Sequence, residues 1–191
     1  MKELYYEETV EILNLKTAKA RYKIFKLISV ISYIMMALWI YVMMMYVLNP
    51  AYLTSYFLLG LGPAVVFCAT GVACSLIKNK FFTEYDYSVL TGSVRFSKII
   101  NRNKRKAIMS FSTSDIERIG RVGSETYNKF VKMPDVSKRT FTPNNTATEG
   151  KGFYYLFVNY RGSKLLLTIE CSKIFISNIF SYCKRHVLED K

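Results

Sequence analysis

The feature that most constrains this chain is an uncharged run of 51 consecutive residues, 27–77. Its first part, 27–48, is 22 residues of aliphatic, Met and aromatic side chains with one Ala and two Ser. That length crosses a hydrocarbon core of about 30 Å. Asn49 and Pro50 then favour a helix stop and restart, and 51–77 is long enough for a second, tilted span. The run predicts a transmembrane hairpin of two helices and excludes a charged, disordered tail.

Lysine and arginine flank both predicted spans, whereas the connection between the spans has neither. Positive residues near the ends of spans stay on the cytoplasmic side. We therefore expect a multi-pass protein of the cell membrane with both termini in the cytoplasm. The flanking cations are Lys16, Lys19, Arg21, Lys23 and Lys26 before the first span, and Lys78 and Lys80 after the second.

The second predicted span carries small residues at four-residue spacing, Gly60/Ala64 and Gly71/Ser75. This spacing lets helix backbones approach closely. It favours packing against the first span, and it leaves open a contact with a second copy or a protein partner. Neither span contains an ionisable residue, which argues against an ion path through this chain alone.

The segment 1–26 has a mostly apolar seam with acidic residues in its first half and basic residues in its second. Both charge positions suit a helix dipole. The pattern predicts an amphipathic helix, lying either flat on the membrane or packed on the cytoplasmic domain or a partner. The seam residues recur at steps of three and four: Tyr6, Val10, Leu13, Thr17, Ala20 and Ile24.

Residues 78–191 carry 21 Lys and Arg against 10 Asp and Glu, a net charge of +11, and are numerous enough to bury a core. Residues 83–89 alternate apolar with polar, so we expect a strand whose acidic residues Glu84 and Asp86 face solvent. Thr91-Gly92 indicates a hairpin turn. Further strands are expected at 93–100, 106–111, 153–160 and 164–170, with weaker candidates at 115–122 and 127–133. The Pro-, Thr- and Asn-rich segment 134–152 predicts a long mobile loop.

After Ser172 the apolar residues recur at helical spacing, which predicts a C-terminal helix with Ser172 as its N-cap. Its apolar face comprises Ile176, Ile179, Phe180, Cys183 and Val187. Ile179 and Phe180 are expected to be buried under the sheet. Lys184, Arg185 and His186 would suit the helix C-terminus. The whole order therefore predicts an α+β domain of antiparallel strands followed by one helix.

This layout resembles the pleckstrin-homology (PH) superfold, in particular the bacterial PH-like domains that follow transmembrane hairpins. The resemblance rests on 85–95, on SFSTSDIERI at 110–119 and on the terminal helix. With its lead TVEILNLKTAKAR, the chain is similar to an uncharacterised family of small two-span bacterial membrane proteins. The resemblance implies an antiparallel PH-like bent sheet or barrel closed by the C-terminal helix. It implies no activity.

Patterns of catalytic or metal-binding residues are weak in this sequence. Cys183 and His186 are three apart, which gives two metal ligands where a zinc site needs three or four. The four cysteines, Cys68, Cys74, Cys171 and Cys183, form no CxxC pair and imply no disulfide framework. We therefore expect no enzyme, no cofactor, no metal site and no identifiable small-molecule substrate.

A cluster of five cations in nine residues, 98–106, is the strongest candidate site. Near a membrane such a cluster can attract anionic lipid, and it can equally be a solvated turn. Nucleic acid is not expected, because the run lacks interleaved aromatic residues. The candidate membrane-surface contacts are Lys78, Lys80, Lys98, Arg102, Lys104, Arg105 and Lys106.

These patterns predict a non-catalytic membrane protein that presents a basic PH-like domain at the inner membrane surface. The expected partners are the lipid bilayer and, through the hairpin, a protein partner or a second copy. The alternative is an accessory subunit of a membrane transport or export complex. The predicted divisions are 1–26 for the N-terminal helix, 27–77 for the hairpin and 78–191 for the domain.

Overall fold

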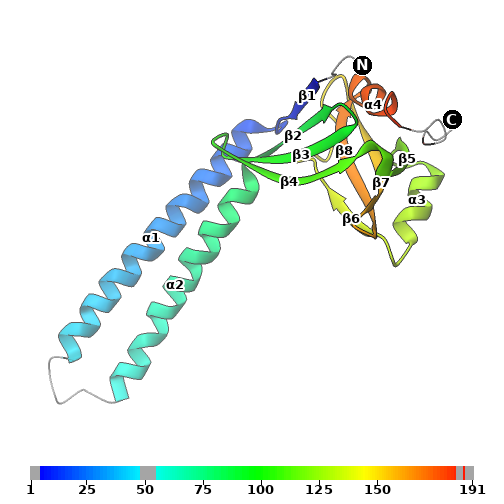
Figure 1. The fold of residues 1–191 in the computed structure, drawn as a ribbon. Helices are drawn as coiled ribbons and strands as arrows, with labels where there is room; N and C mark the ends of the chain where they lie inside the picture. Colours follow the sequence, from blue (N-terminus) through cyan, green and yellow to red (C-terminus); the bar gives the residue numbers. More distant parts are fainter. Residues whose placement is uncertain (1–4, 48–54, 184–186, 188–191) are drawn as a thin grey trace. The chain divides into compact units, whose positions relative to one another are not determined.

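The computed structural model describes residues 5–47, 55–183 and 187, which form two compact units. One unit, 14–82, contains the two long helices α1 (Leu15–Val47) and α2 (Ser55–Phe81). The other unit, which we call the sheet domain, joins 1–13 to 83–191 (Figure 1). The sheet domain is therefore assembled from segments on both sides of the helical hairpin, which differs from the predicted division at residues 26 and 78.

Helices α1 and α2 pack against each other along their length (Figure 1). Ser29 Oγ donates a hydrogen bond to the carbonyl oxygen of Gly71 at 2.9 Å. A Cβ at Gly71 would lie 2.8 Å from the ring of Tyr33, so only glycine fits there without a shift. Both helices are long and apolar enough to cross a membrane, with mean hydropathies of 2.1 and 1.7. Packing between the two long helices, as predicted from the small residues, is therefore found at Gly71.

The first sheet has four antiparallel strands in the order β1-β2-β3-β4. They are β1 (Tyr5–Val10), β2 (Thr83–Leu90), β3 (Ser93–Ile100) and β4 (Lys104–Ser112). The helix predicted over 1–26 is thus wrong for residues 5–10, and α1 begins only at Leu15. YYEETV consists largely of residues that suit a strand, and pairing with β2, from Tyr5↔Leu90 to Val10↔Tyr85, outweighs the helical seam.

The second sheet has the order β5-β7-β8-β6. Its strands are β5 (Ile116–Arg121), β7 (Lys151–Tyr160), β8 (Ser163–Ser172) and β6 (Ser137–Thr140), and a short 3₁₀ turn, η2 (Thr113–Asp115), precedes β5. The pairing is antiparallel except that β6 runs parallel to β8. The described part of the domain is thus two four-stranded sheets, and no closed barrel joins them.

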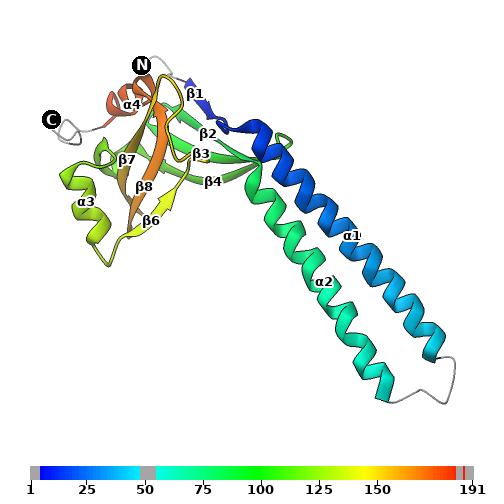
Figure 2. The same ribbon diagram turned by 180° about the vertical axis from the view of Figure 1, so that it is seen from behind.

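Residues 127–133, a weak strand candidate, instead fall largely in helix α3 (Glu125–Lys132). Ser124 Oγ accepts a hydrogen bond from the backbone N–H of Tyr127 and caps the helix. The Phe130 ring stacks on Phe157 of β7 with centroids 4.1 Å apart. Both views place α3 alongside the second sheet (Figure 1, Figure 2). The aromatic residues that suggested a strand therefore form the apolar face of a short helix.

The main core lies between the two sheets and under helix α4 (Lys173–Phe180). Ser172 caps α4 as expected, accepting a hydrogen bond from the N–H of Phe175. Ile179 is fully buried, as predicted, but Phe180 is only half-buried and Phe175 takes the central position. Helix α4 ends at Phe180, and the predicted basic C-terminus at 184–186 lies outside the described residues.

The segment 134–152, predicted to be a mobile loop, is organised around the fully buried carboxylate of Glu170 on β8. That carboxylate accepts hydrogen bonds from Thr142 Oγ1 at 2.6 Å and Asn144 Nδ2 at 3.0 Å. The backbone N–H of Thr148 donates at 2.7 Å, and its hydroxyl donates as well. Asn144 also bonds the backbone at Glu11 and Leu13. The loop is therefore ordered by hydrogen bonds that converge on one buried carboxylate and by bonds from Asn144 to the segment after β1.

Candidate functional site

The basic cluster forms the turn between β3 and β4. Asn101 and Arg102 adopt positive φ angles of 54° and 56°, which reverse the chain tightly and pair Ile100 with Lys104. The β3–β4 hairpin thus brings together five of the seven predicted contact residues, at 98–106. The other two, Lys78 and Lys80, lie in the last turn of α2 in the helical unit.

The two arginines of the β3–β4 hairpin form ion pairs with acidic residues of β1, β2 and the segment after β1. Arg102 lies 3.1 Å from both Glu84 and Glu11. Arg105 lies 2.6 Å from Asp86 and also pairs with Glu7. The side chains of Glu84 and Asp86 are only 6% and 4% exposed, so the prediction that they face solvent is wrong. These arginines hold the first sheet together and are not free cations.

The three lysines of the β3–β4 hairpin lie on the face of the first sheet opposite to that of Arg105. The register places Lys98 opposite both Tyr85 and Lys106, and Lys104 opposite Ile100. Since side chains alternate along a strand, Lys104 and Lys106 point away from the face of Arg105. Within the described part of the chain, none of the three forms an ion pair. We call Lys98, Lys104 and Lys106 the lysine face.

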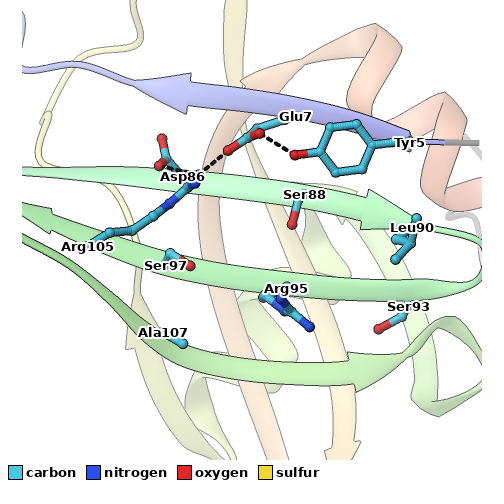
Figure 3. Close-up of a pocket in the computed structure, with 10 residues that line it drawn as sticks. All are labelled: Tyr5, Glu7, Asp86, Ser88, Leu90, Ser93, Arg95, Ser97, Arg105 and Ala107. Atoms are coloured by element: carbon cyan, nitrogen blue, oxygen red, sulfur yellow. Dashed lines mark hydrogen bonds and ion pairs between the residues drawn. The ribbon is translucent and has the colours of Figure 1, made fainter.

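A polar pocket of about 350 Å³ occupies the outer face of the first sheet (Figure 3). Arg105 lies at one side with Glu7 and Asp86, and Arg95 of β3 lies farther along the same face. Hydrogen bonds from Tyr5 and Arg105 hold the pKa of Glu7 below its ordinary value, and the bond to Glu7 raises the pKa of Arg105. Both partners are therefore fully charged near neutral pH, which suits an ion pair and not proton transfer.

The acidic residues of the N-terminal segment attach β1 to the domain. Glu8 accepts hydrogen bonds from the N–H and Oγ of Ser172 and lies 3.1 Å from Lys151. Together with Glu7 and Glu11, it places a carboxylate against three different parts of the domain. Sequence reasoning misses this role, because the helical seam assigns these acids to a helix. The share of Tyr, Thr and Val in YYEETV is the only local signal that favours a strand.

Of the two candidates for nucleophile or metal chemistry, Cys183 and His186, only Cys183 lies within the described residues. Cys183 is half-buried, its thiol lies 3.6 Å from the carbonyl oxygen of Thr113, and burial raises the pKa of Cys183 to about 11. A nucleophilic thiolate needs the opposite shift. His186 lies outside the described residues. Among the residues that the structure describes, no group of three His, Cys, Asp or Glu side chains is arranged to hold a metal ion.

The chain matches the model of a protein family described as a bacterial PH-like domain (DUF6106). The match covers residues 2–189 and so includes β1, the helical hairpin and the rest of the sheet domain. Neither the curated proteins nor the solved structures gave a significant match.

Proposed function

This chain belongs to the bacterial PH-like domain family DUF6106, and we propose that it is a non-catalytic, multi-pass protein of the cell membrane. Its hairpin spans the bilayer with both termini in the cytoplasm. The PH-like domain is held at the inner membrane surface and docks there on anionic lipid through the lysine face. A protein partner is the alternative target of the same surface.

The observation that carries this proposal is the place of the hairpin in the sequence. Four residues separate the end of β1 at Val10 from the start of α1, and one residue separates the end of α2 from the start of β2 at Thr83. The two strands are paired neighbours, with Val10 opposite Tyr85. Four residues reach at most about 14 Å, so neither connection lets the domain move far from the ends of its helices. A hairpin inserted between paired strands also requires both strands to lie on one side of the membrane.

Confinement at the surface makes weak contacts effective, because the local concentration of headgroups is high. Each lysine near an anionic leaflet contributes about 1 kcal/mol, and the attraction falls with ionic strength. Lys98, Lys104 and Lys106 would together contribute about 3 kcal/mol if all three face the headgroups. Arg102 and Arg105 contribute little, since their charges are already paired.

We expect replacement of the three face lysines by serine to abolish most binding of the domain to anionic vesicles. The protein for this test joins 1–13 to 83–191 through a short Gly-Ser linker, because a fragment beginning at residue 80 would lack β1. At low salt the affinity should fall roughly 100-fold, which corresponds to about 3 kcal/mol. Co-sedimentation measures this directly.

The matched control replaces three exposed lysines elsewhere in the domain, Lys129, Lys132 and Lys138, and so removes the same charge. It should bind nearly as well as the unmodified protein. Equal loss in both triple variants would indicate a net-charge effect, and undiminished binding by the face variant would leave partner docking as the better account.

The alternative function, an accessory subunit of a membrane transport or export complex, is favoured by one observation on α2. Gly62, Ala69 and Ala73 are exposed in the helical unit and recur at seven- and four-residue spacing, whereas Gly71 is used within the hairpin. Such positions permit close approach by a further helix. Extraction in mild detergent tests this alternative, since a monomeric extract would exclude a stable complex.

A further inference from the structure

A second pocket, of about 670 Å³ and lined by three cations, lies at one end of the second sheet. Three segments meet there: the end of β5 at Arg121, the start of β7 at Lys151 and the start of α4 at Lys173. The sheet register explains the convergence. Arg121 pairs with Tyr154 on β7, and Lys151 pairs with Ser172, the residue before Lys173. All three cations line the same pocket, although they are up to 52 residues apart in the sequence.

Two of these three cations are uncompensated. Arg121 and Lys173 are exposed, and in the described part of the chain neither forms an ion pair. The residues that line the pocket include no carboxylate. Next to Lys151, Gly150 has a φ of +78°, and a Cβ placed on it would meet no atom within 4 Å, so the pocket wall is open there. The pocket therefore has excess positive charge and free volume.

The third cation shows that this end of the domain already binds one anion. The Glu8 carboxylate accepts hydrogen bonds from the N–H and Oγ of Ser172 and contacts Lys151 Nζ, which also donates to the carbonyl oxygen of Thr9 at 2.6 Å. Glu8 thereby neutralises Lys151 and is bound by Ser172, the N-cap residue of α4. A further anion would be bound by Arg121 and Lys173, with Lys151 shared between it and Glu8.

We propose that this pocket binds a phosphomonoester or pyrophosphate group. Three cations less one carboxylate leave about two positive charges, which matches the charge of roughly −2 on a phosphomonoester at neutral pH. The arginine guanidinium can bind two phosphate oxygens at once, and lysine supplies a point charge. The volume lies within the range of roughly 300–1,000 Å³ that is typical of small-ligand pockets. The site shares no residue with the lysine face.

The direct test titrates pyrophosphate into the full chain in nanodiscs of neutral lipid, by calorimetry. Arg121→Gln with Lys173→Gln should weaken binding at least tenfold, and binding should weaken as salt is added. The control pair Lys129→Gln and Lys132→Gln removes the same charge from α3 and should bind within about twofold of the unmodified chain. Binding that survives in the Arg121/Lys173 variant, or is lost equally in the control, would overturn the proposal.

A third variant, Glu8→Gln, has the opposite expected effect. Glutamine still accepts hydrogen bonds from Ser172 but no longer neutralises Lys151, so pyrophosphate should bind about threefold more tightly or better. Binding no tighter than that of the unmodified chain would contradict the assignment of Lys151 to the site.

A second arm identifies the source of the phosphate group. Nanodiscs containing phosphatidic acid carry a phosphomonoester on lipid, and amine labelling of Lys173 is compared with that in neutral nanodiscs. Protection by phosphatidic acid supports a lipid headgroup, and protection by added pyrophosphate alone supports a soluble ligand. Absence of both kinds of protection would contradict phosphate binding at this pocket.

Discussion

Replacing Phe175 by alanine should lower the free energy of unfolding of the PH-like domain by about 3–5 kcal/mol. Phe175 is fully buried, and its ring lies 6.2 Å from that of Tyr6 on β1 and 5.7 Å from that of Tyr87 on β2. It therefore connects the terminal helix to two strands that lie on opposite sides of the hairpin in the sequence. Thermal unfolding of the full chain in detergent should show a melting temperature lower by roughly 10 °C or more.

The neighbours of Phe175 on α4 provide the controls. Ile174 is 61% exposed, and its replacement by alanine should change the free energy of unfolding by no more than about 0.5 kcal/mol. Phe180 is half-buried, so its replacement should have an intermediate effect. If Phe180→Ala were as destabilising as Phe175→Ala, helix α4 would pack differently from the arrangement described.

The second large effect is expected at Glu170. Its replacement by glutamine should lower the free energy of unfolding by about 2–4 kcal/mol. The carboxylate accepts four hydrogen bonds, whereas a glutamine turns an NH₂ group towards donors that can no longer be satisfied. Glu149 is exposed in the same loop, so Glu149→Gln is the matched control and should be nearly neutral. Chemical unfolding of the three proteins at pH 7 measures the difference.

The effect of Glu170 also has a defined pH dependence. Burial by itself would raise the pKa of Glu170, but the hydrogen bonds from Thr142, Thr148 and Asn144 outweigh burial and hold the pKa below its ordinary value of 4.5. A lowered folded-state pKa adds stability above pH 4.5, and that stability is lost as the pH falls through the folded-state value. The unmodified chain and Glu170→Gln should therefore converge in acid. If the difference in free energy of unfolding between the two proteins stays constant down to about pH 2, the charge of the carboxylate does not contribute to stability.

The helical hairpin and the strands β2, β3, β7 and β8 could be predicted from the sequence, because each is encoded by a local pattern. An uncharged run has the length of two spans, and residues 83–89 alternate strictly. Strand β1 could not be predicted in this way, since YYEETV has no apolar–polar alternation and its apolar residues fit the helical seam of 1–26. Its partner β2 begins 73 residues after β1 ends, so the pairing that decides the conformation is not local.

The charged sites show the same dependence on distant partners. The basic run 98–106 is recognisable as a cluster, but the separation of its arginines from its lysines depends on strand faces and on acids from β1. The order of the loop 141–150 depends on the Glu170 carboxylate of β8 and on bonds from Asn144 to the backbone at Glu11 and Leu13. Arg121, Lys151 and Lys173 look unrelated in the sequence and meet only through strand pairing. In each case the missing information is which distant segment lies beside the residue.

The central claim is that β1 and β2 pair on the inner side of the membrane, with the hairpin between them in the chain. The most direct test is a disulfide between Tyr5→Cys and Leu90→Cys, two exposed residues that are opposite each other in the register. The four native cysteines are replaced by alanine, and Tyr5→Cys with Lys129→Cys is the mismatched control.

In membranes, the Tyr5/Leu90 pair should form an intramolecular disulfide in high yield, and the control pair should not. A membrane-impermeant reductant should break this disulfide in inside-out vesicles but not in sealed right-side-out vesicles, which lack the reductants of the cytosol, and this difference would place the pair on the cytoplasmic side. An uncrosslinked pair, a crosslink only between two copies, or reduction by the impermeant reagent in right-side-out vesicles would contradict the claim.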